Sequence, residues 1–384
     1  MKYSELYNFV GKDGIDGFFI FYTAILNGMD VQRMPGQLLL INNHRAPDSK
    51  TSFVHSVAQS TRLSTTTFVL QKRFRRVLFQ QAKVSMPKAA TFSFSSRKDP
   101  VKYANKIGYP VTVKEVFGEN PSFSIRGVQN KKELFSAMRK VRRHLPVNSP
   151  RAPSSYAQTI NLGSAETVDE DKRIKSHRSR FIVEKQLDGD FYRVYVIGGR
   201  ASFVVKFDSN SLQVVESPSS SINRLAETAV ASVPGIKNAA VDIVEDENKS
   251  VYLTEFSERL LPPVMSVEED FFSNFGQLYQ SLLEYEIGLV NGTFSSRRKR
   301  ATYVIEIKGV SNIPKFTESF LALVNALRLE QRVSETCNIF GKIKFQISGS
   351  CFDVAIALEN LLETQNITHL QLCRKRIIKK YSLF

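Results

Sequence analysis

Two carboxylates thirteen residues apart, Asp242 and Glu255, lie in stretches whose apolar alternation predicts two consecutive strands. The polar segment 245–250 between them predicts a turn, and a hairpin brings directly opposed side chains to the same face of a sheet. Hard cations such as magnesium prefer oxygen ligands and usually bind together with substrate phosphates. The pair therefore predicts a site for divalent cations, although a solvated acid is the simpler interpretation of either residue alone.

Start and stop signals for helices predict the elements upstream of this pair. Pro100 after Asp99 starts a helix, which Gly108 ends. Asn130 with Glu133 forms a capping-box pattern at the start of another helix. The elements expected before residue 145 are a helix over 73–81, a helix over 99–107, a strand over 109–114 and a helix over 130–144.

The part of the chain around the two carboxylates predicts mainly antiparallel strands. Gly198 and Gly199 separate two alternating stretches, as in a hairpin with a two-residue turn. The expected elements are a strand over 181–187, the hairpin 191–197 and 201–207, a helix over 221–233, the two carboxylate strands, and a helix over 268–288. Before them, the segment 145–179 is rich in proline and mixed charge and predicts a long mobile loop.

After the basic run 297–300, the pattern is strand 302–308, helix 314–328, strands 331–337 and 341–348, helix 352–363 and strand 368–374. This βαββαβ order is that of the ferredoxin-like arrangement. We therefore expect three parts. They are a small N-terminal lead-in over 1–62 with a buried strand at 37–41, a central domain over 63–294, and a separate C-terminal domain over 300–384.

The composition is that of a globular protein, with 42% hydrophobic and 23% charged residues in 384. The formal net charge of +16 predicts attraction to anions: nucleotides, acidic peptides, nucleic acid or a membrane surface. The basic runs are scattered and not interleaved with aromatic residues, so dispersed solvated charge is the simplest interpretation and nucleic acid is not the expected partner.

Three cysteines without a CxxC motif argue against a disulfide framework or a zinc site. No apolar run of 18 residues predicts a membrane span, and the first residues do not resemble a secretory signal. We expect a reduced, cytoplasmic protein without a membrane partner.

Four segments, in this order, resemble motifs of the ATP-grasp superfamily of carboxylate–amine ligases, especially its cyanophycin synthetase and D-alanine–D-alanine ligase branch. They are Leu70 to Pro87, Ala104 to Lys114 with its Gly108-Tyr109-Pro110 turn, Phe181 to Val194, and Gly235 to Glu255. The resemblance covers residues 63–290, about 60% of the chain. It implies an α+β, ATP-grasp fold, in which two α+β subdomains sandwich ATP, followed by the ferredoxin-like βαββαβ domain.

The resemblance also implies an activity: an ATP- and Mg²⁺-dependent ligase that forms an amide or peptide bond through an acylphosphate intermediate. In such a reaction the protein mainly positions the reactants and neutralises charge. The resemblance implies that Lys114, with Lys72 or Arg76, binds the ATP phosphates, and that Arg193 binds the acylphosphate. It implies an adenine slot lined by Glu184, Lys185, Gln186 and Leu187, with Asp190 near the ribose. The implied magnesium ligands are Asp242, Glu255 and Ser257.

The sequence departs from the family's pattern at several of these positions. Ser257 replaces the usual metal-binding asparagine, Glu115 replaces a proline after the lysine, and Phe191 replaces a ribose-binding carboxylate. The phosphate loop 118–127 is poor in glycine. These departures keep a second hypothesis open, a degenerate ATP-grasp protein that binds nucleotide or a partner without ligase activity. Each cation also has a simpler interpretation, which for Arg193 is a cross-strand ion pair.

The C-terminal domain resembles acylphosphatase-like small domains in topology. Its loop 309–315 lacks the arginine that acylphosphatases need, so we expect a binding or dimerisation domain. The expected partners of the chain are ATP, a carboxylate substrate (an amino acid, a peptide or a carrier-linked acid) and an amine. Whether the chain forms a homo-oligomer stays open. A third hypothesis, a basic nucleic-acid-binding module, depends on the net charge and on this C-terminal domain.

Overall fold

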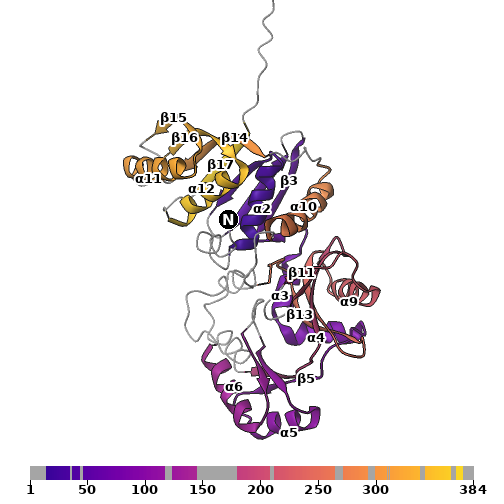
Figure 1. Ribbon diagram of the computed structural model, residues 1–384. Coiled ribbons are helices and arrows are strands. Elements are labelled where there is room, and N and C mark those ends of the chain that lie inside the picture. The colour runs from indigo at the N-terminus through magenta and orange to yellow at the C-terminus, as the bar shows by residue number, and fades with distance from the viewer. Residues whose placement is uncertain are drawn as a thin grey trace, which may run out of the picture. The chain divides into compact units, whose positions relative to one another are not determined.

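The computed structural model describes residues 14–34, 37–43, 46–116, 123–144, 180–207, 212–263, 271–292, 299–308, 310, 312–337, 342–364 and 369–374. The expected loop 145–179 lies outside these residues. The chain forms two compact units, one from residues 60–265 and one from residues 1–59 together with 266–384. Helices and antiparallel strands occur in both units, which confirms the α+β class (Figure 1).

One half of the 60–265 unit, the four-stranded lobe (residues 88–116, 123–144 and 180–187), contains an antiparallel sheet in the order β5–β8–β6–β7. Its elements are β5 (Ala89–Ser93), α5 (Lys98–Ile107), β6 (Val111–Glu115), β7 (Ser124–Val128), α6 (Lys131–His144) and β8 (Arg180–Lys185). Val111, Val113 and Val183 pack with Ala104 of α5 and Leu134 of α6 in the core. The alternate residues of β6 and β8 therefore point to the opposite face of the sheet.

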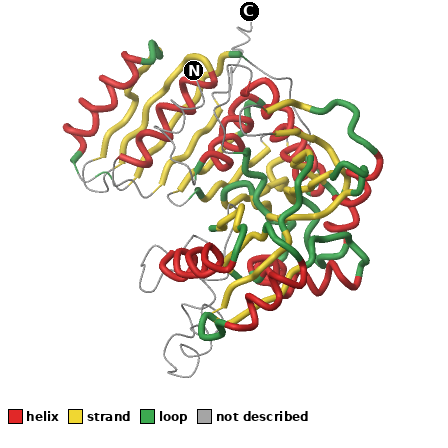
Figure 2. Tube along the Cα trace, turned by 60° about the horizontal axis from the view of Figure 1, so that its bottom comes forward, coloured by secondary structure: helices red, strands yellow, loops and turns green. Residues whose placement is uncertain are grey.

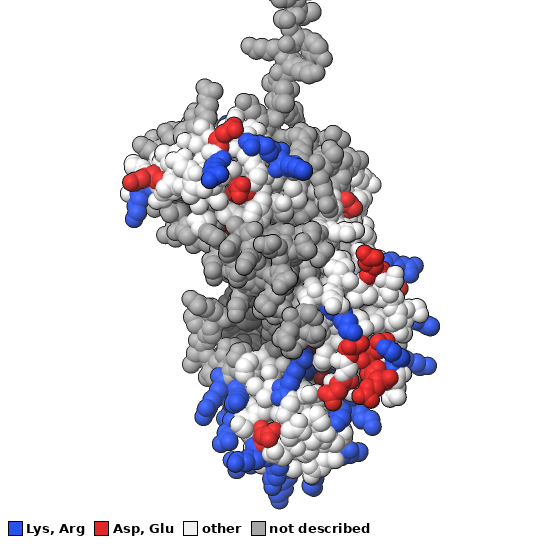
Figure 3. Space-filling model, viewed as in Figure 1, with Lys and Arg blue, Asp and Glu red and all other residues white. Residues whose placement is uncertain are grey.

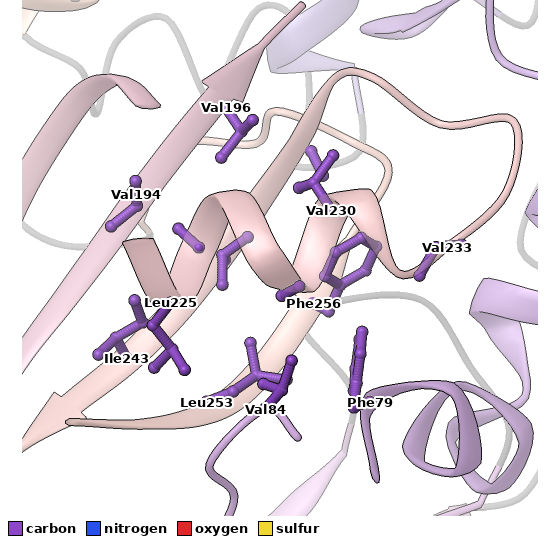
Figure 4. Close-up of a cluster of buried hydrophobic side chains, with 14 of the residues drawn as sticks. Phe79, Val84, Val194, Val196, Leu225, Val230, Val233, Ile243, Leu253 and Phe256 are labelled. Atoms are coloured by element: carbon purple, nitrogen blue, oxygen red, sulfur yellow. The ribbon is translucent and has the colours of Figure 1, made fainter. Parts of the chain in front are cut away.

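The five-stranded lobe (residues 188–207 and 212–263) contains the antiparallel sheet β11–β10–β9–β12–β13. Its elements are β9 (Asp190–Ile197), β10 (Arg200–Phe207), β11 (Leu212–Val214), α9 (Ser220–Ala231), β12 (Ala239–Glu245) and β13 (Val251–Ser257). Val194 and Ile243 face Leu225 and Val230 of α9 in a buried cluster (Figure 4). The strands are apolar on the α9 side, so their polar residues lie on the other face.

Helices α3 (Leu63–Leu70) and α4 (Lys72–Gln81) precede these lobes in the chain. Phe79 of α4 joins the core of the five-stranded lobe, where its ring centroid lies 5.4 Å from that of Phe256 (Figure 4). The buried side of α4 carries Phe79 together with Lys72 and Arg75, whereas Phe74 and Val77 on the opposite side are exposed. Phe79 therefore packs on Phe256 of β13, and Lys72 and Arg75 lie beside Glu255, the neighbouring residue on the opposite face of that strand.

The other unit contains an eight-stranded sheet in the order β15–β16–β14–β17–β1–β2–β3–β4. Its strands are β1 (Asp30–Met34), β2 (Leu38–Asn43), β3 (Ala46–Val54), β4 (Val57–Ala58), β14 (Arg300–Lys308), β15 (Glu330–Cys337), β16 (Lys342–Ser350) and β17 (His369–Arg374). Its helices are α2 (Ile15–Leu26), α10 (Phe271–Leu289), α11 (Ile313–Ala326) and α12 (Cys351–Thr364). They pack side by side as one layer, α10 on α2, α2 on α12 and α12 on α11, beside the strands (Figure 2).

The packing of this unit differs from the expected division into a lead-in and a separate C-terminal domain. Strand β1 pairs with β17, with Val31 opposite Leu372, so residues from both ends of the chain share one sheet. The ring of Phe19 in α2 stacks on Tyr279 of α10 at 4.9 Å, which places the helix expected at 268–288 in this unit. Helix α2 carries its own buried apolar residues on nearly all sides, and a helix of this kind must be covered by other elements.

The local predictions agree closely with the observed elements. The capping box at α6 is confirmed: Glu133 N donates to Asn130 Oδ1 at 3.0 Å and Asn130 Nδ2 donates to Glu133 Oε1 at 2.6 Å. The hairpin around Gly198 and Gly199 is confirmed as β9 and β10. Within the described residues, none of the helices combines the length and apolar character that a membrane crossing needs.

Candidate functional site

A cluster of buried charges lies between the polar faces of the two lobes of the 60–265 unit. Lys114 of β6 points away from the α5 and α6 side of its sheet, and only 5% of it is exposed. Its Nζ lies 2.6 Å from Glu184 Oε1 on the neighbouring strand β8 and 3.2 Å from Glu255 Oε1 on β13. Although burial alone lowers the pKa of Lys114, the carboxylates of Glu184 and Glu255 outweigh burial and raise it. Lys114 is therefore held in its charged form.

Helix α4 supplies three more cations to the same carboxylates. Lys72, Arg75 and Arg76 follow a spacing of three and four residues, which places them on one side of the helix. Arg75 Nη2 donates to Glu255 Oε2 at 2.7 Å, and Arg76 Nη1 donates to Glu184 Oε2 at 3.0 Å. Sequence reasoning singled out Lys72 and Arg76 but missed Arg75, which the same helical spacing would have identified.

Lys72 differs from the other cations because its ammonium has no hydrogen-bond partner in the described part of the chain. Only 3% of the residue is exposed, and the nearest carboxylate oxygen, Glu255 Oε1, lies 3.9 Å from Nζ. Burial, with a smaller contribution from Arg75, lowers the pKa of Lys72 to about 8. The attraction of Glu255 raises the pKa but does not offset these two effects. The site therefore holds one poorly compensated cation.

Glu255 lies at the centre of this charge cluster. Burial by itself raises the pKa of its carboxyl group, but Lys72, Lys114 and Arg75 outweigh burial and hold the pKa well below its usual range. Glu255 thus stays ionised through the physiological pH range and joins β13 to both α4 and β6.

Arg193, Asp242 and Glu255 stand in one row across β9, β12 and β13, as neighbouring register partners. The register confirms that the two carboxylate strands are adjacent and antiparallel. Arg193 Nε and Nη2 donate to the two carboxylate oxygens of Asp242 at 2.6 and 2.8 Å, and Nη1 donates to the Leu261 carbonyl at 3.0 Å. Burial lowers the pKa of Arg193, but Asp242 more than offsets this and raises it. The cross-strand ion pair considered for Arg193 is therefore present.

The remaining residues of the expected site lie apart from the charge cluster. Lys185 Nζ donates to the carbonyls of Gly108 and Tyr109 at 3.2 and 3.0 Å, and Gln186 Oε1 accepts from Gly127 N at 2.6 Å. Both contacts stay within the four-stranded lobe and hold the β8 end against the loop before β6 and against β7.

Beyond the end of β8, Leu187 is half-buried and has no polar side chain. Asp190 is half-buried, and its carboxylate is paired with Lys206 Nζ at 2.8 Å. The Phe191 ring lies under the guanidinium of Arg126, 5.6 Å from its centroid. Ser257 is buried in the β13 end, and its Oγ accepts from Arg259 N at 3.1 Å. The contacts of Asp190 and Ser257 thus stay within the five-stranded lobe, whereas Phe191 meets Arg126 of the four-stranded lobe.

The cluster lines a small pocket with more positive than negative charge. Four cations and two carboxylates border it, while the buried Glu115 nearby accepts from Phe123 N at 3.0 Å. The lining residues are Lys72, Arg75, Arg76, Phe79, Met86, Lys114, Ile182, Glu184, Leu253, Thr254, Glu255 and Phe256. Buried cations in excess over carboxylates suit an anionic ligand with several oxygen acceptors.

Comparison with solved structures returns ATP-grasp ligases among its matches. The D-alanine–D-alanine ligase of Bacillus anthracis in complex with ATP aligns at 13% identity and a TM-score of 0.41, over 60% of this chain and 69% of that chain. The enzyme from Coxiella burnetii aligns at 15% identity and a TM-score of 0.43, over 60% of this chain and 59% of that chain.

The ATP-grasp ligase PsnB, in complex with a phosphomimetic variant of a minimal precursor, Mg and ADP, aligns at 14% identity and a TM-score of 0.38. This alignment covers 58% of our chain and 60% of the PsnB chain. No protein-family model and no curated protein sequence matches the chain.

Proposed function

We propose that the chain binds ATP with magnesium at the cluster around Lys72 and Lys114 and is an ATP-dependent carboxylate–amine ligase. The observation that carries the proposal is the Lys72 ammonium, which is buried in a positively charged pocket without a hydrogen-bond partner among the described residues. The three segments of the chain that resemble ATP-grasp motifs around Lys114, Glu184 and Glu255 also come together here.

The residues present fit the phosphate groups of a nucleotide. A phosphate oxygen would give the Lys72 ammonium the acceptor it lacks, and charge-assisted hydrogen bonds of this kind are the strong ones. Lys114 and Arg76 already hold Glu184 between them, so their positions are fixed before a ligand arrives. Such preorganisation lowers the entropic cost of binding.

The residues also fit magnesium in the way magnesium is usually held, by one or two carboxylates together with substrate phosphates. Asp242 and Glu255 are register partners on one face of the sheet. Each carboxylate has about four lone-pair sites, and the ion pairs described above use only some of them. The Ser257 hydroxyl, which accepts from Arg259 N, is the weakest of the three expected ligands.

In the proposed reaction, ATP supplies the phosphoryl group that activates a carboxylate, and an amine then displaces phosphate to form the amide bond. Lys72, Lys114 and Arg76 would neutralise the phosphates, and this electrostatic role is the main contribution a protein makes to such transfers. Arg193 lies beside Asp242 and would stabilise charge on the activated carboxylate if its guanidinium turns from that partner.

One observation favours the second candidate, a nucleotide-binding protein without ligase activity. The three nitrogens of Arg193 all donate to protein acceptors, two to Asp242 and one to the Leu261 carbonyl. An arginine held in this way stabilises the sheet and directs no free edge of its guanidinium toward a substrate. ADP release distinguishes the two candidates, because only the ligase consumes ATP.

The C-terminal segment supports the ferredoxin-like part of the proposal by its strand order. β15–β16–β14–β17 are antiparallel neighbours and arise from the βαββαβ sequence of elements. We assign to this part a binding or dimerisation role in the proposed enzyme.

Calorimetric titration with ATP, with and without magnesium, tests the proposal on wild type, on Lys72→Met and on Arg73→Met. Arg73 is exposed on α4 and does not line the pocket, so its loss removes one charge next to the site without changing the pocket. We expect magnesium-dependent binding in wild type and Arg73→Met. Loss of a hydrogen bond to a charged group costs about 1.5–3 kcal/mol, so Lys72→Met should bind about 10- to 150-fold more weakly.

Two outcomes decide the matter. Absence of binding at millimolar ATP in the wild type overturns the nucleotide proposal altogether. If Lys72→Met binds ATP as tightly as Arg73→Met does, the nucleotide binds elsewhere on the protein and not at this cluster. When binding is established, ADP release in the presence of mixed amino acids, acidic peptides and amines identifies a ligase, and its absence leaves the second candidate.

A further inference from the structure

Among the described residues, most of the net positive charge lies in the four-stranded lobe. Its described residues include fifteen Lys and Arg against four Asp and Glu, a net charge of +11. The described residues of the five-stranded lobe include seven basic and ten acidic ones, a net charge of −3. The two lobes therefore differ in the sign of their net charge.

Nearly all of this positive charge is on the surface. Thirteen of the fifteen basic side chains are exposed, against two exposed acids, Asp99 and Glu133. Within the described chain none of the thirteen forms an ion pair. They are Lys88, Arg97, Lys98, Lys102, Lys106, Arg126, Lys131, Lys132, Arg139, Lys140, Arg142, Arg143 and Arg180.

Most of these side chains lie on α5 and α6, and we call the outward side of the two helices the basic surface. Lys98, Lys102 and Lys106 follow each other every four residues, which spaces them by about 6 Å along one side of α5. In Figure 3 basic side chains gather where Figure 1 places α5 and α6. The apolar sides of both helices pack on the sheet, whose other face carries Lys114. The basic surface is therefore separate from the proposed nucleotide site.

Helix electrostatics explains only part of this pattern. Arg142 and Arg143 in the last turn of α6 interact favourably with the helix dipole. Lys98 in α5, and Lys131 and Lys132 in α6, are instead in first turns, where positive charge is unfavourable. Like charges four residues apart also repel each other. An arrangement that lowers helix stability in this way points to a ligand that compensates it.

We propose that the basic surface binds the phosphate backbone of double-stranded nucleic acid without reading its bases. The exposed large hydrophobic residues of the described chain, Leu38, Leu63, Phe74, Val77 and Leu289, all lie outside the four-stranded lobe. The surface thus lacks the apolar core of a protein interface and the apolar side of a membrane-bound helix. It has no exposed aromatic platform of the kind that stacks single-stranded bases. Exposed cations without an apolar surface between them match a duplex backbone, which offers phosphates along both strands.

The proposal gives a quantitative salt dependence. Each phosphate contact releases a counterion, so the logarithm of the binding constant falls with the logarithm of salt concentration by about 0.9 per contact. With about five contacts the affinity falls about 500-fold between 50 and 200 mM salt. The base sequence of the duplex should have little influence on the affinity, because the surface contacts no base.

Fluorescence anisotropy with a labelled 20-base-pair DNA duplex, on the full chain at 50, 100 and 200 mM NaCl, tests the proposal. The test variant carries Arg139→Gln, Lys140→Gln and Arg143→Gln on α6. The control carries Arg200→Gln, Arg224→Gln and Lys237→Gln, which removes two arginines and one lysine from exposed positions of the five-stranded lobe. Thermal unfolding establishes that both variants are folded.

We expect wild type and control to bind with the same salt slope, and the α6 variant to bind more weakly with a slope shallower by about 2.7. Failure of the wild type to bind at 50 mM NaCl, or equal loss in both variants, overturns the proposal. If polyglutamate displaces the duplex at an equal concentration of charges, the surface binds an acidic polypeptide instead, and the proposal is overturned. Displacement by phosphatidylserine vesicles assigns it to an anionic membrane, which also overturns the proposal.

Discussion

The ammonium of Lys114 in the four-stranded lobe lies 3.2 Å from Glu255 Oε1 in the five-stranded lobe. The Lys72 ammonium lies 3.9 Å from the same oxygen, without a hydrogen bond among the described residues. One carboxylate oxygen is thus shared by two buried cations from different elements. The excess charge lowers the stability of the ligand-free protein, and this cost should appear in unfolding experiments.

Replacing Lys72 by methionine should stabilise the ligand-free protein at pH 7. The pKa of Lys72 is lowered from 10.5 to about 8, mainly by burial, so its charged form is disfavoured in the folded state. A shift of this size corresponds to about 3 kcal/mol, which Lys72→Met removes. Urea unfolding of wild type, Lys72→Met and the exposed control Arg73→Met measures the gain. A Lys72→Met protein less stable than wild type contradicts the prediction.

The same shift predicts how the gain depends on pH. Between pH 8 and 10.5 the unfolded chain binds a proton at Lys72 that the folded protein has lost, so wild-type stability rises with pH in this range. The advantage of Lys72→Met is therefore full below pH 8 and disappears as the pH approaches 10.5. Urea midpoints at pH 7, 8, 9 and 10 test this, and a constant difference between the two proteins would falsify the assigned titration.

Replacing Glu255 by glutamine should have the opposite effect. It leaves Lys114 and Arg75 buried without their shared carboxylate, and loss of one partner of a buried ion pair costs about 3–5 kcal/mol. The pKa of Glu255 is lowered, so its extra stability is present above the unfolded pKa near 4.5 and is lost as the pH falls below that value. The difference between wild type and variant should shrink below pH 4.5.

Urea unfolding at pH 7, 5 and 4 measures this effect, with Glu216→Gln as the control. Glu216 is exposed in the same lobe, so its replacement should change the free energy of unfolding by less than about 0.5 kcal/mol. A loss that is equally large in both variants would mean that global charge, and not the cluster around Glu255, determines stability.

Gly189 joins β8 to β9 and is the turn that connects the two lobes. Its φ of +149° is a backbone conformation that other residues rarely adopt, and a Cβ there would overlap the carbonyl oxygen of Glu245. Gly189→Ala should lower the free energy of unfolding by more than about 2 kcal/mol. Gly199→Ala, at φ +82° without such an overlap, should cost only about 1–2 kcal/mol. Equal costs contradict the role of the overlap.

The sequence predicted local elements well because their signals are local. The capping box of Asn130 and Glu133 and the two-glycine turn after β9 depend on residues a few positions apart. The pairing of β1 with β17 depends on residues more than 300 positions apart, and no turn or cap marks it. The covering of α2 by α10 and α12 is of the same kind. Long-range packing of this sort follows from burial requirements that many arrangements can satisfy.

The candidate site shows the same division. Periodicity and turn length were enough to predict that Asp242 and Glu255 lie on adjacent strands. Helical spacing places Arg75 on the same side of α4 as Lys72 and Arg76, but its pairing with Glu255 depends on the packing of Phe79 on Phe256. The partners of Lys185 and Gln186 are backbone groups, whose positions a sequence does not specify.

Arg193 and Asp242 should behave as one energetic unit. Two parallel hydrogen bonds at 2.6 and 2.8 Å join the buried guanidinium to the carboxylate, and the Leu261 carbonyl accepts from the remaining nitrogen. Asp242→Asn leaves a buried cation poorly paired and should cost about 3–5 kcal/mol, as should Arg193→Gln. Because each single change removes the same interaction, Arg193→Gln with Asp242→Asn should cost less than the sum by at least about 2 kcal/mol. Urea unfolding of the four proteins measures this coupling, and additive costs would show that the pair contributes little to the stability of the sheet.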